Sequence, residues 1–210
     1  MAKPKKAVKS PGPKQLSKTL TRIHEAGHVV VAWFDAHLPK IKKVTVKSGE
    51  GYLGFAQIKW KRHHSQMQGI EETRALIRFF LGGRMTEKIC GGPKMFGASY
   101  DLFQANLMAR FMVMGLGLSE EFGNTLPMFL PMGDRTKQTA DDAMMKIMRE
   151  CSVETERLLR KRRKQVMAVA FALQKKKTLK TRHLKKILGP RPKREIAPLL
   201  PEKKTNARRR

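Results

Sequence analysis

Two histidines four residues apart, His24 and His28, bracket the segment with the clearest chemistry in the sequence, because Glu25 completes the pattern H-E-x-x-H. On a helix this separation returns the side chains to one face, so both imidazoles can bind one tetrahedral Zn²⁺. Zinc lowers the pKa of a bound water to about 7, and Glu25 is placed to accept its proton without being a ligand. The pattern therefore predicts the chemistry of a metallopeptidase.

Catalytic zinc needs a third protein ligand, and the spacing leaves its identity open. A third histidine six positions after the second would stand at position 34, which is a phenylalanine. Glu50 falls in an expected turn, while Glu71 and Glu72 fall on an expected helix without distinguishing context. Asp101 follows a Gly-Ala-Ser-Tyr segment at an expected helix start, where the helix dipole favours a carboxylate. That position also fits an ordinary helix cap, so spacing alone does not decide whether Asp101 is a metal ligand or a cap.

Apolar residues at three- and four-residue steps place the H-E-x-x-H motif on a helix over positions 16–36, which ends before Pro39. Gly82-Gly83 interrupts a second helical pattern and indicates close packing against another element. The sequence thus predicts a mainly α fold with a small β element, of the α+β class. The further expected elements are helices over 67–89, 100–114, 140–173 and 181–188, strands over 41–47 and 51–58, and a polar connection over 115–139.

The charge is strongly basic: 45 Lys and Arg stand against 17 Asp and Glu, for a formal net charge of +28. Both ends are Lys- or Arg-rich and contain prolines, which predicts a flexible basic arm over 1–15, a folded domain over 16–189 and a basic Pro/Arg-rich tail over 190–210. Such an excess of positive charge either keeps the chain solvated or attracts polyanions, and composition alone does not distinguish these two roles.

Cys90 and Cys151 are too few for a disulfide framework or a cysteine-only zinc site, which fits a reducing compartment. We expect both to be buried structural thiols. No apolar run reaches the roughly 18 residues of a membrane-spanning helix, and the start has no apolar signal core. The expected location is the cytoplasm, with an organelle matrix as the alternative.

Several short motifs follow the zinc motif in a fixed order. Together with it they resemble the peptidase domain of the FtsH family over roughly positions 16–188. The motifs are Leu38-Pro39, Lys42-Lys43-Val44-Thr45-Val46, Tyr52-Leu53-Gly54-Phe55, Leu81-Gly82-Gly83-Arg84, Gly97-Ala98-Ser99-Tyr100-Asp101-Leu102, Ala109-Arg110, Gly117-Leu118-Ser119, Phe122-Gly123, Thr178-Leu179 and Ile187-Leu188.

The resemblance implies a helical zincin-type peptidase domain that binds Zn²⁺. It implies that His24 and His28 are metal ligands, that Asp101 is the third ligand and that Glu25 is the general base. It also implies that an edge strand receives the substrate as an added strand. The residues expected to bind substrate in this way are Gly51, Tyr52, Leu53, Gly54, Phe55 and Ala56.

FtsH proteins place a membrane anchor and an AAA ATPase before this domain, whereas the printed sequence contains no G-x-x-x-x-G-K-[ST] phosphate loop. We therefore expect a zinc endopeptidase without its own ATPase, which cleaves peptides or unfolded protein segments or works with an AAA unfoldase in trans. Family members form hexamers, and a homo-oligomer is one expectation here. The alternative function is a catalytically silent basic protein on the same fold that binds nucleic acid, a ribosome or an anionic surface.

Overall fold

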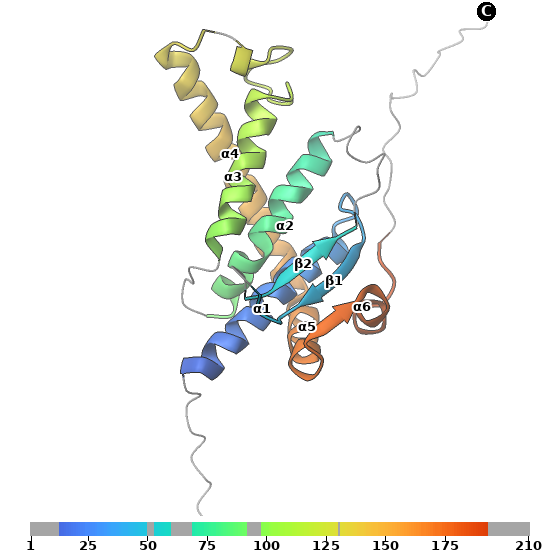
Figure 1. Cartoon of the computed structure of the whole chain (residues 1–210). Helices are drawn as coiled ribbons and strands as arrows, with labels where there is room; N and C mark the ends of the chain where they lie inside the picture. The colour runs from blue at the N-terminus through green and yellow to red at the C-terminus, as the bar shows by residue number, and fades with distance from the viewer. Residues whose placement is uncertain (1–12, 50–52, 60–68, 92–97, 130, 193–210) are drawn as a thin grey trace, which may run out of the picture.

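The computed structural model describes residues 13–49, 53–59, 69–91, 98–129 and 131–192, and it shows helices packed around a small sheet (Figure 1). This is the mainly helical α+β fold that the sequence predicts. None of the helices in these ranges combines the length and the apolar character needed to cross a membrane. The elements are α1 (Pro13–Phe34), β1 (Ile41–Thr45), β2 (Phe55–Ile58), α2 (Ile70–Ile89), α3 (Ser99–Met114), a 3₁₀ turn (Pro127–Phe129), α4 (Asp134–Lys161), α5 (Arg163–Lys175), β3 (Thr178–Lys180) and α6 (Thr181–Leu188).

The sheet is antiparallel, with the strand order β2-β1-β3. β1 ends at Thr45, two residues earlier than expected, because Thr45 makes the last pair on both sides, with Phe55 and with Thr178. The sequence pattern missed β3, since three residues are too few to show an alternation of period two. β2 therefore lies at one edge of the sheet and β3 at the other.

The glycine pair in α2 does not interrupt the helix, which runs unbroken from Ile70 to Ile89. The pair instead lets α1 and α2 approach each other. A Cβ atom on Gly27 would lie 2.4 Å from the Gly82 carbonyl oxygen and 2.2 Å from Thr86 Oγ1. The helix expected across this pair and the expected close packing are both confirmed, because the missing side chains interrupt the apolar pattern without breaking the backbone and serve a helix contact.

The long helix expected over 140–173 is two helices. α4 begins at Asp134 and ends at Lys161, and α5 begins at Arg163. Arg162 between them has φ −107° and ψ 22°, and its guanidinium lies 4.2 Å from the centre of the Phe34 ring. No glycine or proline marks this break, because it comes from tertiary packing: α4 packs on α2 and α3, while α5 packs on α1.

Two apolar clusters share α2. One joins α1, the sheet, α5 and α6, and it contains Val30 and Val44 at 0% exposure. The other joins α2, α3 and α4 around Ile77 and Cys151. α1 is buried on several sides, which fixes the orientation of the helix that carries the H-E-x-x-H motif. The first helix begins at Pro13, inside the segment predicted as an arm, where proline is well tolerated because the first helical N–H needs no partner.

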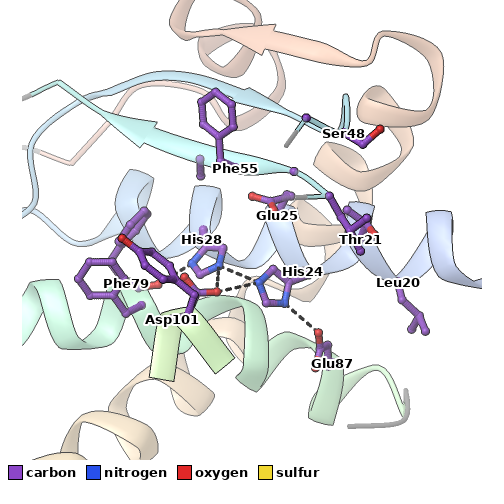
Figure 2. A pocket seen from close by; sticks show the side chains of 16 residues that line it. Leu20, Thr21, His24, Glu25, His28, Ser48, Phe55, Phe79, Glu87 and Asp101 are labelled. Carbon is purple, nitrogen blue, oxygen red and sulfur yellow. Dashed lines mark hydrogen bonds and ion pairs between the residues drawn. The ribbon is translucent and has the colours of Figure 1, made fainter. Parts of the chain in front are cut away.

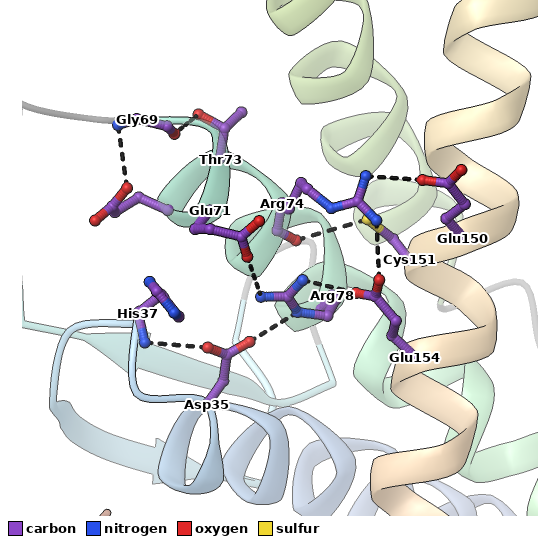
Figure 3. A network of polar contacts seen from close by, with 11 residues as sticks. Asp35, His37, Gly69, Glu71, Thr73, Arg74, Arg78, Glu150, Cys151 and Glu154 are labelled. Carbon is purple, nitrogen blue, oxygen red and sulfur yellow. Dashed lines mark hydrogen bonds and ion pairs between the residues drawn. The ribbon is translucent and has the colours of Figure 1, made fainter. Parts of the chain in front are cut away.

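An ionic network ties the end of α1 to α2 and α4, and its Arg78–Asp35 pair is buried (Figure 3). Arg78 Nε donates to Asp35 Oδ2 at 2.8 Å, and Arg78 Nη1 donates to Glu154 Oε2 at 2.7 Å. Arg74 adds contacts of 2.9 Å to both Glu150 and Glu154. These contacts hold α2 against α4 and against the end of α1.

Candidate metal centre

Helix α1 presents His24, Glu25 and His28, all less than a tenth exposed, and the start of α3 brings Asp101 against them (Figure 2). The two histidine Nε2 atoms are 3.1 Å apart. Asp101 Oδ2 lies 3.0 Å from Nε2 of His24 and 3.2 Å from Nε2 of His28. Among the residues that the structure describes, these three side chains form the one group arranged to share a metal ion.

The other nitrogen of each imidazole has its own partner. His24 Nδ1 is 2.8 Å from Glu87 Oε1, and His28 Nδ1 is 2.7 Å from the carbonyl oxygen of Phe79. A carbonyl oxygen and a carboxylate can only accept, so both Nδ1 atoms donate. In the neutral imidazoles both Nε2 lone pairs then point toward Asp101. This is the usual arrangement around a histidine that binds metal.

This donor set fits a small divalent cation. Two nitrogen lone pairs and a carboxylate oxygen within 3.2 Å of one another repel unless positive charge lies among them. Ligand atoms around a tetrahedral Zn²⁺ are about 3.3 Å apart, given Zn–N bonds of about 2.0 Å. The spacing here is close to that value, and two histidines with one carboxylate are a common zinc set.

The charges around the site favour a cation. With no ion bound, a proton can take the place of the cation: burial alone would lower the pKa of His24, but the hydrogen bonds that the protonated ring donates to Asp101 and Glu87, together with the charge of Glu25, raise it to about 10. Burial alone would raise the pKa of Asp101, but the nearby His28 charge and the hydrogen bonds to both histidines hold it well below its usual range. The three carboxylates therefore make this buried place attractive to positive charge.

Glu25 faces away from the ligand atoms, toward the strand. Burial raises the pKa of its carboxyl group, and the charges of His28 and His24 offset part of that rise. Its Oε2 atom is buried and has no hydrogen-bond partner within the described ranges. A Cβ atom on Gly54 would lie 2.9 Å from Glu25 Oε1, so the glycine lets β2 approach the carboxylate.

A cleft of about 700 Å³ opens above these residues. Four of the residues expected to bind substrate lie in its lining, namely Leu53, Gly54, Phe55 and Ala56. Gly51 and Tyr52 fall outside the described residues. Figure 2 shows β2 crossing above Glu25 and His28. The wall also includes Leu20, Thr21, Ser48, Gly49, Phe79, Phe80, Glu87 and Tyr100.

Sequence reasoning missed three contributions from α2. Glu87 and the Phe79 carbonyl hold the imidazoles, and Gly83 makes room, since a Cβ there would lie 2.4 Å from His24 Nε2. Gly83 and Glu87 are one helical turn apart, which was the available signal for a shared face. Two other carboxylates weighed as ligands lie elsewhere: Glu72 accepts from the Gly69 N–H, and Glu71 lies 3.9 Å from an Arg78 nitrogen.

Within the ranges that the structure describes, the histidine and cysteine residues outside the motif do not join the ligand group; His63 and His64 fall outside these ranges. His183 is near the start of α6, where its Nδ1 accepts from the Lys180 N–H. His37 lies beyond the end of α1, and its backbone N–H donates to Asp35 Oδ1. Cys151 is buried, as expected, whereas Cys90 is only half-buried because it lies at the end of α2.

A mainly helical domain with an H-E-x-x-H helix and a converging carboxylate is the architecture of a zinc metallopeptidase. Comparison with known protein families matches residues 13–187 to Peptidase family M41. The chain therefore belongs to this family, as the resemblance to FtsH implied, and the family implies Zn²⁺ as the cofactor.

Individual relatives agree with this assignment. The chain is 31% identical over 207 residues to ATP-dependent zinc metalloprotease FtsH 4 of Sphaerobacter thermophilus, covering 86% of this chain and 30% of the relative. It is 29% identical over 188 residues to ATP-dependent zinc metalloprotease FtsH of Rhodothermus marinus, covering 83% and 26%. A mitochondrial inner membrane m-AAA protease component of Mus musculus is 31% identical over 185 residues, covering 83% and 23%. The chain thus spans less than a third of the length of these relatives.

Proposed function

We propose that this chain is a zinc-dependent endopeptidase in which His24, His28 and Asp101 hold the ion and Glu25 is the general base. One observation carries the proposal: three ligand atoms within 3.2 Å of one another share the lining of one cleft of about 700 Å³ with Glu25. Membership of a family of metallopeptidases supports it.

When bound, zinc would polarise a peptide carbonyl and make a water molecule acidic enough to release a proton near neutral pH. Glu25 would take that proton and deliver it to the nitrogen of the leaving amine. Its raised pKa suits this work, because a base is most effective when its pKa lies near the working pH. Glu87 and the Phe79 carbonyl keep the two imidazoles in the tautomer that presents Nε2.

The substrate is proposed to be an extended polypeptide that pairs with the edge of β2 that faces away from β1. Strand pairing is made by hydrogen bonds to the substrate backbone. Polypeptides of many sequences can therefore bind, but the bound segment must be unfolded. The absence of a side chain at Gly54 brings that edge close to Glu25, and Leu53 and Phe55 are further residues in the lining of the same cleft. Cleavage should therefore be limited by access to unfolded chain rather than by a strict residue preference.

Relatives are named ATP-dependent proteases. We infer that folded substrates reach this site only after unfolding, and an AAA unfoldase acting in trans is the partner that would supply them. The cytoplasmic location and the homo-oligomer remain predictions.

The test combines zinc stoichiometry with cleavage of casein or an unfolded peptide, on the wild type and on Glu25→Gln. We expect about one zinc per chain in both proteins and cleavage only in the wild type, with a loss of about 100-fold or more in the variant. Glu156→Gln is the matched control, because Glu156 pairs with Lys88 on the surface. Zinc in both proteins with cleavage in neither would favour the silent binding protein instead.

A further inference from the structure

A cluster of basic side chains lies at the β3 edge of the sheet, away from the cleft. Lys43 of β1 pairs directly with Lys180 of β3 in the strand register. Lys176 reaches His183 of α6, with 3.4 Å between Nζ and Nε2. We call the four cations whose charges act on His183 the basic cluster; its members are Lys176, Lys180, Arg182 and Lys186. Lys43 is not a member, because its Nζ lies 5.0 Å from the centre of the ring of Phe55, a residue in the lining of the cleft.

Negative charge does not balance this surface. Between positions 157 and 192 the sequence has fourteen Lys and Arg and no Asp or Glu. Within the ranges that the structure describes, the ion pairs do not include any member of the basic cluster. The pKa of His183 is lowered, first by partial desolvation and then by the charges of Lys176, Arg182, Lys180 and Lys186, so this histidine reports a positive local field.

Holding these charges together costs stability, because like charges directly opposite on neighbouring strands repel. Lysine on an edge strand also protects against strand-to-strand aggregation, which would account for Lys180. It does not account for Lys176, Arg182 or Lys186, since all three lie outside β3. An anionic partner bound to these residues would offset the repulsion.

We propose that the basic cluster binds the phosphate backbone of double-stranded nucleic acid, without reading its sequence. Three of the four side chains are lysines, which act as mobile point charges suited to a phosphate chain rather than as the planar forks that clamp carboxylates. The charges are spread from the end of α5 through β3 to α6, and the described contacts place one aromatic ring among them, that of His183, whereas a single strand is held by a row of rings on which successive bases stack. This chemistry favours a duplex over a single strand.

An acidic polypeptide substrate fits the surface less well. The cleft itself is lined by Glu25, Glu87 and Asp101, so it offers acidic peptides no added attraction. Figure 1 shows β3 and α6 on the opposite edge of the sheet from β2, so a duplex bound there leaves the cleft open. The basic cluster would thus tether the protein to nucleic acid while β2 remains available.

The test measures binding of fluorescent DNA and RNA duplexes of about 24 base pairs to the full chain, from about 50 to about 200 mM salt. One variant carries Lys176→Gln, Lys180→Gln, Arg182→Gln and Lys186→Gln. The control variant loses the same charge from exposed positions in the first part of α4, the end of that helix that Figure 1 shows farther from β3 and α6. Its changes are Arg135→Gln, Lys137→Gln, Lys146→Gln and Arg149→Gln.

Each phosphate contact contributes about 0.9 to the slope of log affinity against log salt, so four lost contacts should reduce that slope by about 3 to 4. We expect affinity at about 0.1 M salt to fall at least thirtyfold in the cluster variant, and less than about threefold in the control. Binding should be independent of base sequence and unchanged in Glu25→Gln. A difference between DNA and RNA would identify which duplex the surface prefers.

Equal losses in both variants would overturn the proposal, because binding would then follow net charge or the chain ends. Two further probes are polyglutamate and vesicles of phosphatidylglycerol. If either binds as tightly as the duplexes and loses binding in the cluster variant, the proposal is overturned. The surface is then assigned to an acidic polypeptide or to a lipid, respectively. Thermal unfolding followed by circular dichroism confirms that both variants are folded. Peptidase activity does not enter the readout, so failure here leaves the proposed zinc peptidase untouched.

Discussion

Replacing Glu87 by glutamine tests whether the side chain behind His24 tunes the metal centre. The Glu87 side chain is only 3% exposed, and its Oε1 accepts from His24 Nδ1 at 2.8 Å. Glutamine keeps the size and can still accept this hydrogen bond through its amide oxygen. The change therefore removes the negative charge that makes the imidazole a stronger ligand, while leaving its position nearly unchanged.

The expected effect is a rise of about 10- to 100-fold in the zinc dissociation constant, the usual result when an acidic partner of a metal-binding histidine is lost. That range corresponds to about 1.4 to 2.7 kcal/mol. The upper part is expected here, because burial leaves the charge of Glu87 poorly screened by water.

The assay is competition for zinc against a chromophoric chelator, with the wild type, Glu87→Gln and the control Glu156→Gln side by side. Glu156 forms exposed pairs with Lys88 and Arg160, far from any ligand atom, so its substitution should leave zinc affinity unchanged. A Glu87→Gln protein that binds zinc within about twofold of the wild type would refute the reasoning. An equal loss in both variants would attribute the effect to general destabilisation.

The remaining predictions concern packing and the thiols. Gly27→Ala should lower the free energy of unfolding by about 3 kcal/mol or more in chemical denaturation, because its Cβ would lie 2.2 Å from Thr86 Oγ1. Arg78→Met should cost about 3 to 5 kcal/mol in the same measurement, since it leaves the buried Asp35 carboxylate unpaired. Cys151 should react with a disulfide reagent at about pH 8 only as fast as the protein unfolds, because it is fully buried and burial raises its pKa to about 11.

Each of these has an outcome that would contradict it. Unchanged stability in Gly27→Ala would mean that the two helices can separate without loss. Arg74→Met is the control for Arg78→Met, because its partner glutamates are 43% and 44% exposed; equal costs would show that burial is not the cause. Mass spectrometry would identify the labelled thiol, and labelling of Cys151 before the half-buried Cys90 would contradict the burial argument.

The sequence correctly predicted the elements that depend on the spacing of residues close together along the chain. The helix that carries His24 and His28 follows from its apolar spacing, and α6 has the predicted bounds, Thr181–Leu188. Local patterns failed where packing decides. The break at Arg162 has no glycine or proline, and β3 exists only because β1 lies beside it. The glycine pair of α2 was predicted to mark close packing, and it does, because the missing side chains let α1 approach.

The candidate site likewise has one part that the sequence predicts and another part that depends on how the helices pack. The sequence by itself determined that His24 and His28 share a helical face with Glu25 beside them, because a four-residue step is nearly one helical turn. Only the tertiary structure decided which carboxylate joins them: Asp101 is 77 residues from His24 along the chain, and Glu87 is 63 residues away. Helix periodicity carries no information over such separations, so these partners are set by how α2 and α3 pack against α1.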